Sequence, residues 1–345
     1  MIFVYLLSLV VIPLLLIVSF KLGKVFNLYD YPDGVRKLHK RPILLIGGIF
    51  FQLIFIFYFL IFFYLMAMGE VATYNNIEKN YLVILGIMLA NFLIGIIDDK
   101  KNIKPSIKLV LILCLFFLST HILDKSFIIE KLSFYHNLNI HLYSYSIIFS
   151  SICLVVLLNA INMADGINSL SSLIFLNWIF FLNLMLPSGD FLIVLNIILM
   201  FALVIFVFFN YQNKCFLGDS GCYVLVTYLG FLTIYTYNQN LILPIRYLNI
   251  ESIFLLFMIP GLDMIRLFAI RIINKKNPFS PDNNHFHHIL LKKYGNFLTL
   301  IIYNLLIFIP WFIYLFFISL LPYLILSVLI IYVWLISLNL KSEKK

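Results

Sequence analysis

Apolar runs of roughly 17–25 residues recur along this chain of 345 residues, and they constrain its fold more than any other feature. Each run is long enough to cross a bilayer as a helix, which satisfies every backbone polar group within the segment. The composition agrees, because 63% of the residues are hydrophobic and only 11% are charged. A water-soluble fold of this length needs a far more polar surface. The sequence therefore predicts an all-α, polytopic integral membrane protein.

We expect eleven membrane spans, with ten as the alternative, because one run is short and one turn between runs is tight. The expected spans cover residues 2–20, 43–66, 81–97, 107–123, 146–160, 171–187, 191–209, 221–237, 250–270, 298–318 and 322–340. The first run lacks basic residues before it and a small-residue cleavage site after it, which favours a retained helix over a secretory signal. No internal repeat or polar linker divides the chain, so residues 1–345 are expected to form one membrane domain that ends in two helices within 298–340.

The basic residues are distributed very unequally between the two sets of loops. One set carries 20 of the 24 Lys and Arg residues, and the other carries only Lys79, Lys125, Lys131 and Arg246. Because cytoplasmic loops are enriched in Lys and Arg, the first set is expected to be cytoplasmic. The N-terminus is then outside and the C-terminus inside, which agrees with an odd number of spans. The net charge of +9 is explained by this bias, so no nucleic-acid partner is expected.

Two local patterns complete the expected organisation. The outer segment 124–145 partly alternates apolar and polar residues around Asn137, which predicts a short hairpin. The cysteines are scattered without CxxC spacing, so we interpret them as core thiols. They are Cys114, Cys153, Cys215 and Cys222.

Polar residues gather in five stretches, all on the predicted cytoplasmic face. These are YDYPDGVRKLHKRPILLIGG at 29–48, DDKKNIKPSIK at 98–108, NAINMADGINSLSS at 159–172, FLGDSGCY at 216–223 and a basic, histidine-containing stretch at 263–295. Before the C-terminal tail, every carboxylate on this face belongs to an aspartate. Short carboxylates at a membrane edge suit Mg²⁺, which proteins usually hold with one or two of them and substrate phosphates.

Each stretch alone also has an ordinary explanation. Asp98 and Asp99 can be a helix-end charge pair, edge lysines are usually topogenic anchors, and an Asn-rich run can cap helices. The histidines could hold a transition metal, but no Cys or further His lies nearby in the sequence to complete a shell. These explanations miss the shared location of basic groups that neutralise phosphates, aspartates that hold Mg²⁺ and glycines that let a nucleotide approach. Together the stretches predict phosphoryl transfer from a nucleotide-activated group to a membrane lipid phosphate.

At these residues the chain resembles the polyprenyl-phosphate N-acetylhexosamine-1-phosphate transferases. The resemblance runs in order through DYPDGVRKLHKRPILLIGG, GIIDD, NAINMADGINSL, FLGDSG and FSPDNNHFHH, within residues 25–295. The SPD..H.HH pattern is more similar to the branch that uses UDP-GlcNAc than to the branch that uses UDP-MurNAc-pentapeptide. The resemblance implies transfer of N-acetylglucosamine-1-phosphate from a UDP-sugar to undecaprenyl phosphate, with release of UMP. It implies a first membrane step of cell-envelope polysaccharide synthesis, at the cytoplasmic face of a bacterial inner membrane.

The resemblance also implies roles for individual residues. Mg²⁺, with Mn²⁺ as an alternative, would be held by Asp219 and Asn162. The expected catalytic residues are Asp98, Asp99 and Asp165, and the split of roles between the first two as base, nucleophile or metal holder stays open. The residues expected to bind substrates are Lys108, Asn159, Asn168, Arg266, His285, His287 and His288.

The chain departs from many bacterial members at two positions, with Asn168 in place of Asp and Asn283 in place of Arg. The first change removes a carboxylate and the second a cation near the donor, so an acid role at 168 and the identity of the hexosamine stay open. A non-catalytic partner of such an enzyme is one alternative, and a flippase or transporter of lipid-linked sugars is another. Transporters place polar groups near the bilayer midplane, whereas these lie at one edge. A homodimer is also left open.

Overall fold

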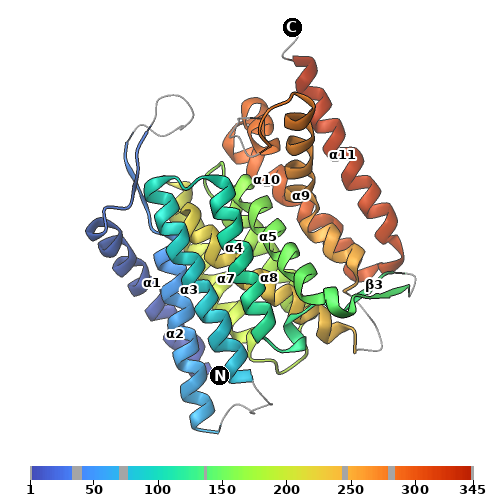
Figure 1. Ribbon diagram of the computed structural model, residues 1–345. Helices are drawn as coiled ribbons and strands as arrows, with labels where there is room; N and C mark the ends of the chain where they lie inside the picture. The colour runs from blue at the N-terminus through green and yellow to red at the C-terminus, as the bar shows by residue number, and fades with distance from the viewer. Residues whose placement is uncertain are drawn as a thin grey trace.

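The computed structural model describes residues 2–32, 41–69, 77–135, 138–242, 248–278 and 284–342, which form eleven α-helices (Figure 1). The helices are α1 (Ile2–Val25), α2 (Gly47–Ala67), α3 (Ile77–Lys101), α4 (Pro105–Ile122), α5 (Ser146–Ala164), α6 (Leu170–Met185), α7 (Leu192–Tyr211), α8 (Gly218–Asn240), α9 (Ile250–Ile273), α10 (Phe286–Phe316) and α11 (Leu321–Ser342). Every predicted span overlaps one of them, including the short run at 146–160. The all-α polytopic fold is thereby confirmed.

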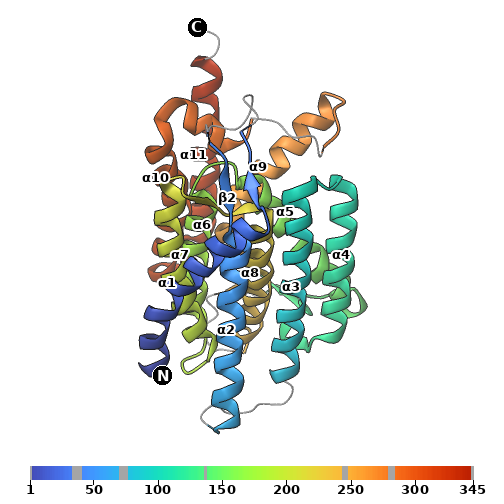
Figure 2. The ribbon, with the colours of Figure 1, turned by 90° about the vertical axis from the view of Figure 1, so that its left-hand side faces the viewer.

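Nine helices in the described part of the chain are long and apolar enough to cross a membrane. The other two are α6, which has only 16 residues, and α8, which is long enough with 23 residues but less apolar. Helix α8 packs against α2, α3, α5 and α6, and Figure 2 shows it behind α2 in the middle of the bundle. A helix enclosed by other helices does not face lipid, so it tolerates polar side chains. Thr227, Thr233 and Thr236 of α8 each donate a hydrogen bond to their own helix backbone four residues earlier.

A small three-stranded sheet corrects the predicted start of the second span. Ile43–Leu45 is a strand, β2, and the helix begins only at Gly47. Strand β2 pairs antiparallel with β1 (Tyr29–Asp30) and parallel with β5 (Cys215–Phe216). Apolar residues at the edge of a span fit a helix and a short strand equally well. Here residues 43–45 form a strand because they pair with the distant backbone of β5. The sheet holds the starts of α2 and α8 side by side.

The helix expected at 298–318 begins earlier, at Phe286. A kink at Gly295, with φ of +73°, divides α10 into a short first part and the longer apolar part. The hairpin predicted within 124–145 is confirmed as β3 (Lys131–Ser133) and β4 (Asn139–His141), an antiparallel pair, and its outer location stays a prediction. The turn residue on which that prediction was centred, Asn137, lies outside the described residues.

The two termini lie at opposite ends of the bundle, as an odd number of passes requires (Figure 1). Which end faces the cytoplasm stays a prediction. The interpretation of the cysteines as core thiols is right for Cys215 and Cys222, which are buried, and wrong for Cys114, which is exposed on α4. The Cys114 side chain lies on the surface of α4 rather than in the core, and Cys153 is only partly buried.

Candidate active site

Glycines bring three helices together at the end of the bundle where the predicted motifs lie. A Cβ atom on Gly95 of α3 would come within 2.3 Å of the Ser220 Cα of α8, and one on Gly48 of α2 within 2.4 Å of the Ser220 Oγ. Because real Cβ atoms do not approach so closely, any larger residue would force the helices apart. Gly48 and Gly95 therefore pack helix against helix. That other glycines of these motifs let a nucleotide approach stays a prediction.

Asp99 of α3 caps the N-terminus of a different helix, α8. Its carboxylate accepts hydrogen bonds from the backbone N–H groups of Asp219, at 2.8 Å, and Ser220, at 3.2 Å. The first N–H groups of a helix have no partner within it, and the helix dipole favours a negative charge there. Gly218, with φ of +73°, makes this contact feasible, because a Cβ at that position would lie 2.9 Å from an Asp99 oxygen.

Asp98 points the other way and binds a lysine. Its carboxylate accepts hydrogen bonds from Lys108 Nζ at 2.6 Å, the Tyr223 hydroxyl at 3.0 Å and the backbone N–H of Ile103 at 2.8 Å. Lys108 Nζ also lies 3.7 Å from a carboxylate oxygen of Asp219. Lys108 thus joins Asp98 and Asp219. We call Asp98, Asp99, Lys108 and Asp219 the aspartate cluster.

Asp219 is the more open carboxylate of the two that Lys108 contacts. Its side chain is 35% exposed, against 4% for Asp98, whose oxygens are already occupied by donors. A carboxylate that binds a cation carried by a substrate must be accessible to that cation. Asp219 meets this requirement better than Asp98.

The end of α5 and the residues just after it contribute four of the predicted residues. Burial, and to a smaller extent the negative charge of Asp99, raises the pKa of the Asp165 carboxyl to about 6. The Oδ1 atom of Asn162 is buried and has no hydrogen-bond partner in the described part of the chain. Asn159 and Asn168 have internal roles, since Asn159 donates to the Val155 carbonyl and Asn168 donates to the Asn213 side chain.

A second group of side chains joins α9, α10 and α11. Asp263 accepts hydrogen bonds from Arg266 Nη2 at 2.7 Å and from the Tyr332 hydroxyl at 3.2 Å, and its other oxygen lies 3.2 Å from His285 Nδ1. The His285 and His287 rings stack with centroids 5.3 Å apart, and the His288 ring lies 4.3 Å from that of His287. We call Asp263, Arg266, His285, His287, His288 and Tyr332 the histidine cluster.

The two clusters approach each other at residues 165–166. The negative charge of Asp99 contributes to the raised pKa of Asp165, and a Cβ on the next residue, Gly166, would lie only 2.2 Å from His287 Nε2. His287 is fully buried, and neither of its ring nitrogens has a hydrogen-bond partner among the described residues. Burying an unpaired polar group is costly. The two unpaired nitrogens therefore make His287 a candidate ligand-binding residue.

The two clusters differ in their fit to a metal ion. Asp263, His285 and His287 bring one ligand atom each within 4.8 Å of one another. Asp263, however, already accepts from Arg266 and Tyr332, and a neighbouring guanidinium opposes a cation. The open carboxylate of Asp219 in the aspartate cluster and the unpaired Oδ1 atom of Asn162 are each an oxygen donor of the kind that Mg²⁺ prefers. These residues fit the predicted ion.

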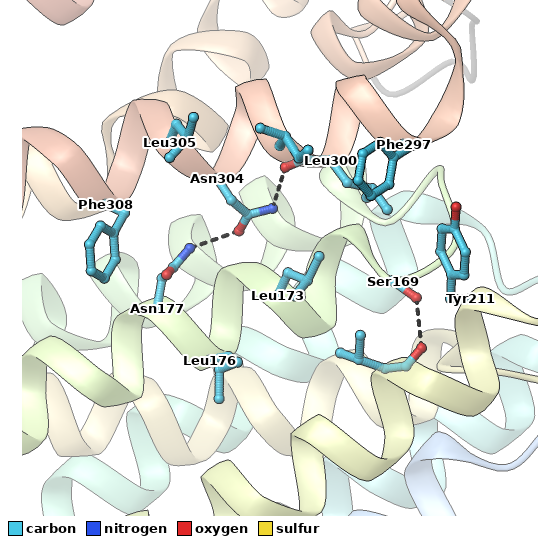
Figure 3. Close-up of a pocket in the computed structure, with 12 residues that line it drawn as sticks. Ser169, Leu173, Leu176, Asn177, Tyr211, Phe297, Leu300, Asn304, Leu305 and Phe308 are labelled. Carbon is cyan, nitrogen blue, oxygen red and sulfur yellow. Dashed lines mark hydrogen bonds between the residues drawn. The ribbon is translucent and has the colours of Figure 1, made fainter.

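An apolar groove of about 450 Å³ lies elsewhere, between α6, α7 and α10 (Figure 3). Across it, Asn177 donates a hydrogen bond of 2.8 Å to Asn304, and Ser169 donates to the Val207 carbonyl at its end. None of the residues that line it is a predicted site residue.

Sequence reasoning missed three contributors to the clusters. Tyr223 appears in the FLGDSGCY stretch without a role, and Asp263 was recognised only as one of several inner carboxylates. Tyr332 lies in the last helix, 69 residues from its partner Asp263, and nothing in the local sequence distinguishes it. Only the packing of α11 against α9 identifies it.

The fold and the site together define a multi-pass helical membrane protein with acidic and basic side chains gathered at one end. Comparison with known sequences refines this class. Residues 81–237 match the profile of Glycosyl transferase family 4. This region runs from α3 to α8 and includes every member of the aspartate cluster.

Curated relatives extend over more of the chain. The undecaprenyl-phosphate alpha-N-acetylglucosaminyl 1-phosphate transferase of Thermotoga maritima is 28% identical over 297 residues, which cover 83% of each chain. The probable undecaprenyl-phosphate N-acetylglucosaminyl 1-phosphate transferase of Bacillus subtilis is 24% identical over 82% of this chain and 74% of its own. The phospho-N-acetylmuramoyl-pentapeptide-transferase of Campylobacter lari is 29% identical over 61% of this chain and 67% of its own. The resemblance to the polyprenyl-phosphate N-acetylhexosamine-1-phosphate transferases is thereby confirmed.

Proposed function

We propose that this protein transfers N-acetylglucosamine-1-phosphate from UDP-N-acetylglucosamine to undecaprenyl phosphate and releases UMP. The observation that carries the proposal is the approach of the aspartate and histidine clusters at residues 165–166. One cluster is rich in carboxylates and the other in basic groups, as a reaction between a metal-bound phosphate and a nucleotide diphosphate requires. The names of the relatives from Thermotoga maritima and Bacillus subtilis supply the sugar and the lipid.

In the proposed reaction, an oxygen of the lipid phosphate attacks the sugar-bound phosphorus. A new P–O bond forms, the bond from that phosphorus to the bridging oxygen breaks, and UMP leaves with the electron pair. The acceptor phosphate is already largely dianionic near neutral pH, so the attack needs no general base. The protein then acts mainly by positioning and by electrostatic stabilisation.

Within this scheme the charged residues have distinct tasks. Asp219 and Asn162 would hold Mg²⁺, which neutralises charge on the diphosphate when bound. Lys108, fixed by Asp98, would place its ammonium group beside the acceptor phosphate. Arg266 and the histidines would bind the donor, and Asp99 would keep the start of α8 in place.

The proposal places the site on the cytoplasmic face of a bacterial inner membrane, because UDP-sugars are made in the cytoplasm. A cysteine at Lys104, with the native cysteines replaced, should be protected from impermeant thiol reagents in intact cells. A cysteine at the exposed Tyr143, on the predicted outer side, should be labelled. Labelling of the Lys104 position alone would reverse the orientation. A homodimer stays a prediction.

The test of the function is an assay of purified protein with undecaprenyl phosphate, Mg²⁺ and a panel of UDP-sugars. We expect equal amounts of UMP and lipid-linked sugar diphosphate, with UDP-N-acetylglucosamine as the best donor. Preference for another UDP-N-acetylhexosamine would correct the sugar and keep the reaction class. Movement of a preformed lipid-linked sugar across vesicles without UMP release would instead support a flippase.

A further inference from the structure

Asp263 is a buried carboxylate surrounded by donors from three helices. It is 4% exposed, and it accepts from Arg266 of its own helix, from Tyr332 of α11 and from the first backbone N–H of α10, that of Phe286, at 3.1 Å. The fourth contact is the 3.2 Å approach of His285 Nδ1. A buried carboxylate is tolerated only when its oxygens are well satisfied, as they are here.

The contact with His285 fixes the state of that ring. An ionised carboxylate can only accept, so the hydrogen between Asp263 Oδ2 and His285 Nδ1 belongs to the histidine. The Nε2 atom is then the nitrogen left for a ligand. A carboxylate behind an imidazole also holds the ring in one orientation.

Tyr332 fixes the neighbouring guanidinium in a similar way. Its hydroxyl accepts a hydrogen bond from Arg266 Nε at 3.1 Å and donates one to Asp263 at 3.2 Å. Arg266 Nη2 donates to the same carboxylate and to the Asn284 carbonyl just before α10. The guanidinium is planar and rigid, so these bonds determine where its remaining N–H groups point.

We propose that Asp263 and Tyr332 are positioning residues that aim His285 and Arg266 at the diphosphate of the nucleotide-sugar donor. The inference rests on the proposed function. It makes α11, which lies outside the family match at 81–237 and beyond the resemblance up to residue 295, a part of the donor site. Neither residue needs to touch the substrate for this role.

The first test is Asp263→Asn, which keeps the shape of the side chain and removes its charge. An amide has only one acceptor oxygen, and its NH₂ group cannot accept from His285. We expect the KM for the UDP-sugar to rise by about tenfold or more, the size of a lost hydrogen bond to a charged group, with the KM for undecaprenyl phosphate unchanged within about twofold. A proportional loss for both substrates would indicate general damage and overturn the inference.

Tyr332→Phe is the second test, because it removes a single hydroxyl and leaves the ring contact with Phe286, at 4.8 Å, in place. It should raise the donor KM by about three- to tenfold without lowering thermal stability comparably. Tyr303→Phe is the matched control, since Tyr303 is also fully buried and its ring lies 5.7 Å from that of Phe286. The control should leave both KM values unchanged, and equal effects of the two tyrosine changes would contradict the role of Tyr332.

A double-mutant cycle tests whether Asp263 acts through His285. If it does, Asp263→Asn should weaken UDP-sugar binding much less in a His285→Gln background than in the wild type. Additive losses would show that Asp263 acts independently of that histidine. Binding of the UDP-sugar is measured by calorimetry, so the cycle does not depend on residual turnover.

The inference and the proposed function fail in different ways. If the wild-type protein neither binds nor consumes any UDP-sugar, the proposed function fails. If the wild-type protein is active and donor binding is unaffected in the Asp263 and Tyr332 variants, only the positioning role fails.

Discussion

The aspartate cluster and the histidine cluster lie at the same end of the bundle but differ in charge: the first is mainly acidic and the second mainly basic. The first contains three carboxylates and one lysine, which contacts Asp98 and Asp219, and Asp219 stays open. The second places one buried carboxylate among an arginine and three histidines. An excess of negative charge attracts a cation, and an excess of basic groups attracts an anion. The difference teaches that the two halves of a phosphate-transfer site are separable in the structure, with residues 165–166 between them.

The largest effect that this comparison predicts comes from removing the open carboxylate. Asp219→Ala should lower turnover by about a thousandfold, ~4 kcal/mol of transition-state stabilisation, because the diphosphate charge is left uncompensated. Chelation of divalent ions should have a comparable effect on the wild-type protein. Turnover within about tenfold of wild type, ~1.4 kcal/mol, would mean that Asp219 is only a turn residue.

The next largest effect distinguishes the adjacent aspartates. Asp98→Asn and Asp99→Asn keep size and remove charge, so both proteins should fold and insert. At least one should lose turnover by about a hundredfold or more, ~2.7 kcal/mol, while UDP-sugar binding changes little. From the geometry we expect the larger loss at Asp98, which holds Lys108, since asparagine is itself a good helix cap in place of Asp99.

Normal turnover in both variants would show that the pair is a solvated helix end. Any role of the aspartate cluster would then rest on Asp219 and Lys108 alone. Calorimetric titration with the UDP-sugar is the accompanying control. If these variants lost donor binding together with turnover, the aspartate pair could not be assigned to the acceptor side alone.

An effect on stability rather than on turnover is expected from Gly218, which lets Asp99 reach the N-terminus of α8. Gly218→Ala should destabilise the protein by about 1–2 kcal/mol for the left-handed backbone and by about 1–3 kcal/mol more for the overlap with Asp99. Gly69 has a nearly identical φ of +74° and nothing within 4 Å of its missing Cβ. Gly69→Ala should therefore lower stability only by the cost of the left-handed backbone. Equal losses of thermal stability in the two variants would contradict the close contact.

The smallest effect concerns position 168, where the family resemblance implies an acid and this chain has Asn168. Asn168→Asp should change turnover by less than about threefold, because residue 168 is paired with Asn213 rather than with either cluster. The lost hydrogen bond should cost about 1 kcal/mol of stability. A large gain in turnover would instead reveal a catalytic acid that this chain lacks, and steady-state UMP release measures it directly.

Much of the fold could be read from local sequence, because a membrane helix satisfies its own backbone and needs only a long apolar run. The runs gave the number and order of the helices. The edges were less predictable, as Ile43–Leu45 shows, because a strand depends on a partner that lies far away in the chain. The β3–β4 hairpin was predictable because its two strands are close to each other in the sequence.

The candidate site divides in the same way. The sequence by itself placed aspartates, lysines and histidines at one end, because residue type and charge bias are visible without coordinates. It could not tell Asp98 from Asp99, which differ only in what they face across the helix interface. Only the tertiary structure decided that Asp99 caps α8, that Asp98 holds Lys108 and that Tyr332 completes the histidine cluster. These roles are hydrogen bonds between helices, and such bonds are set by packing rather than by any pattern along the chain.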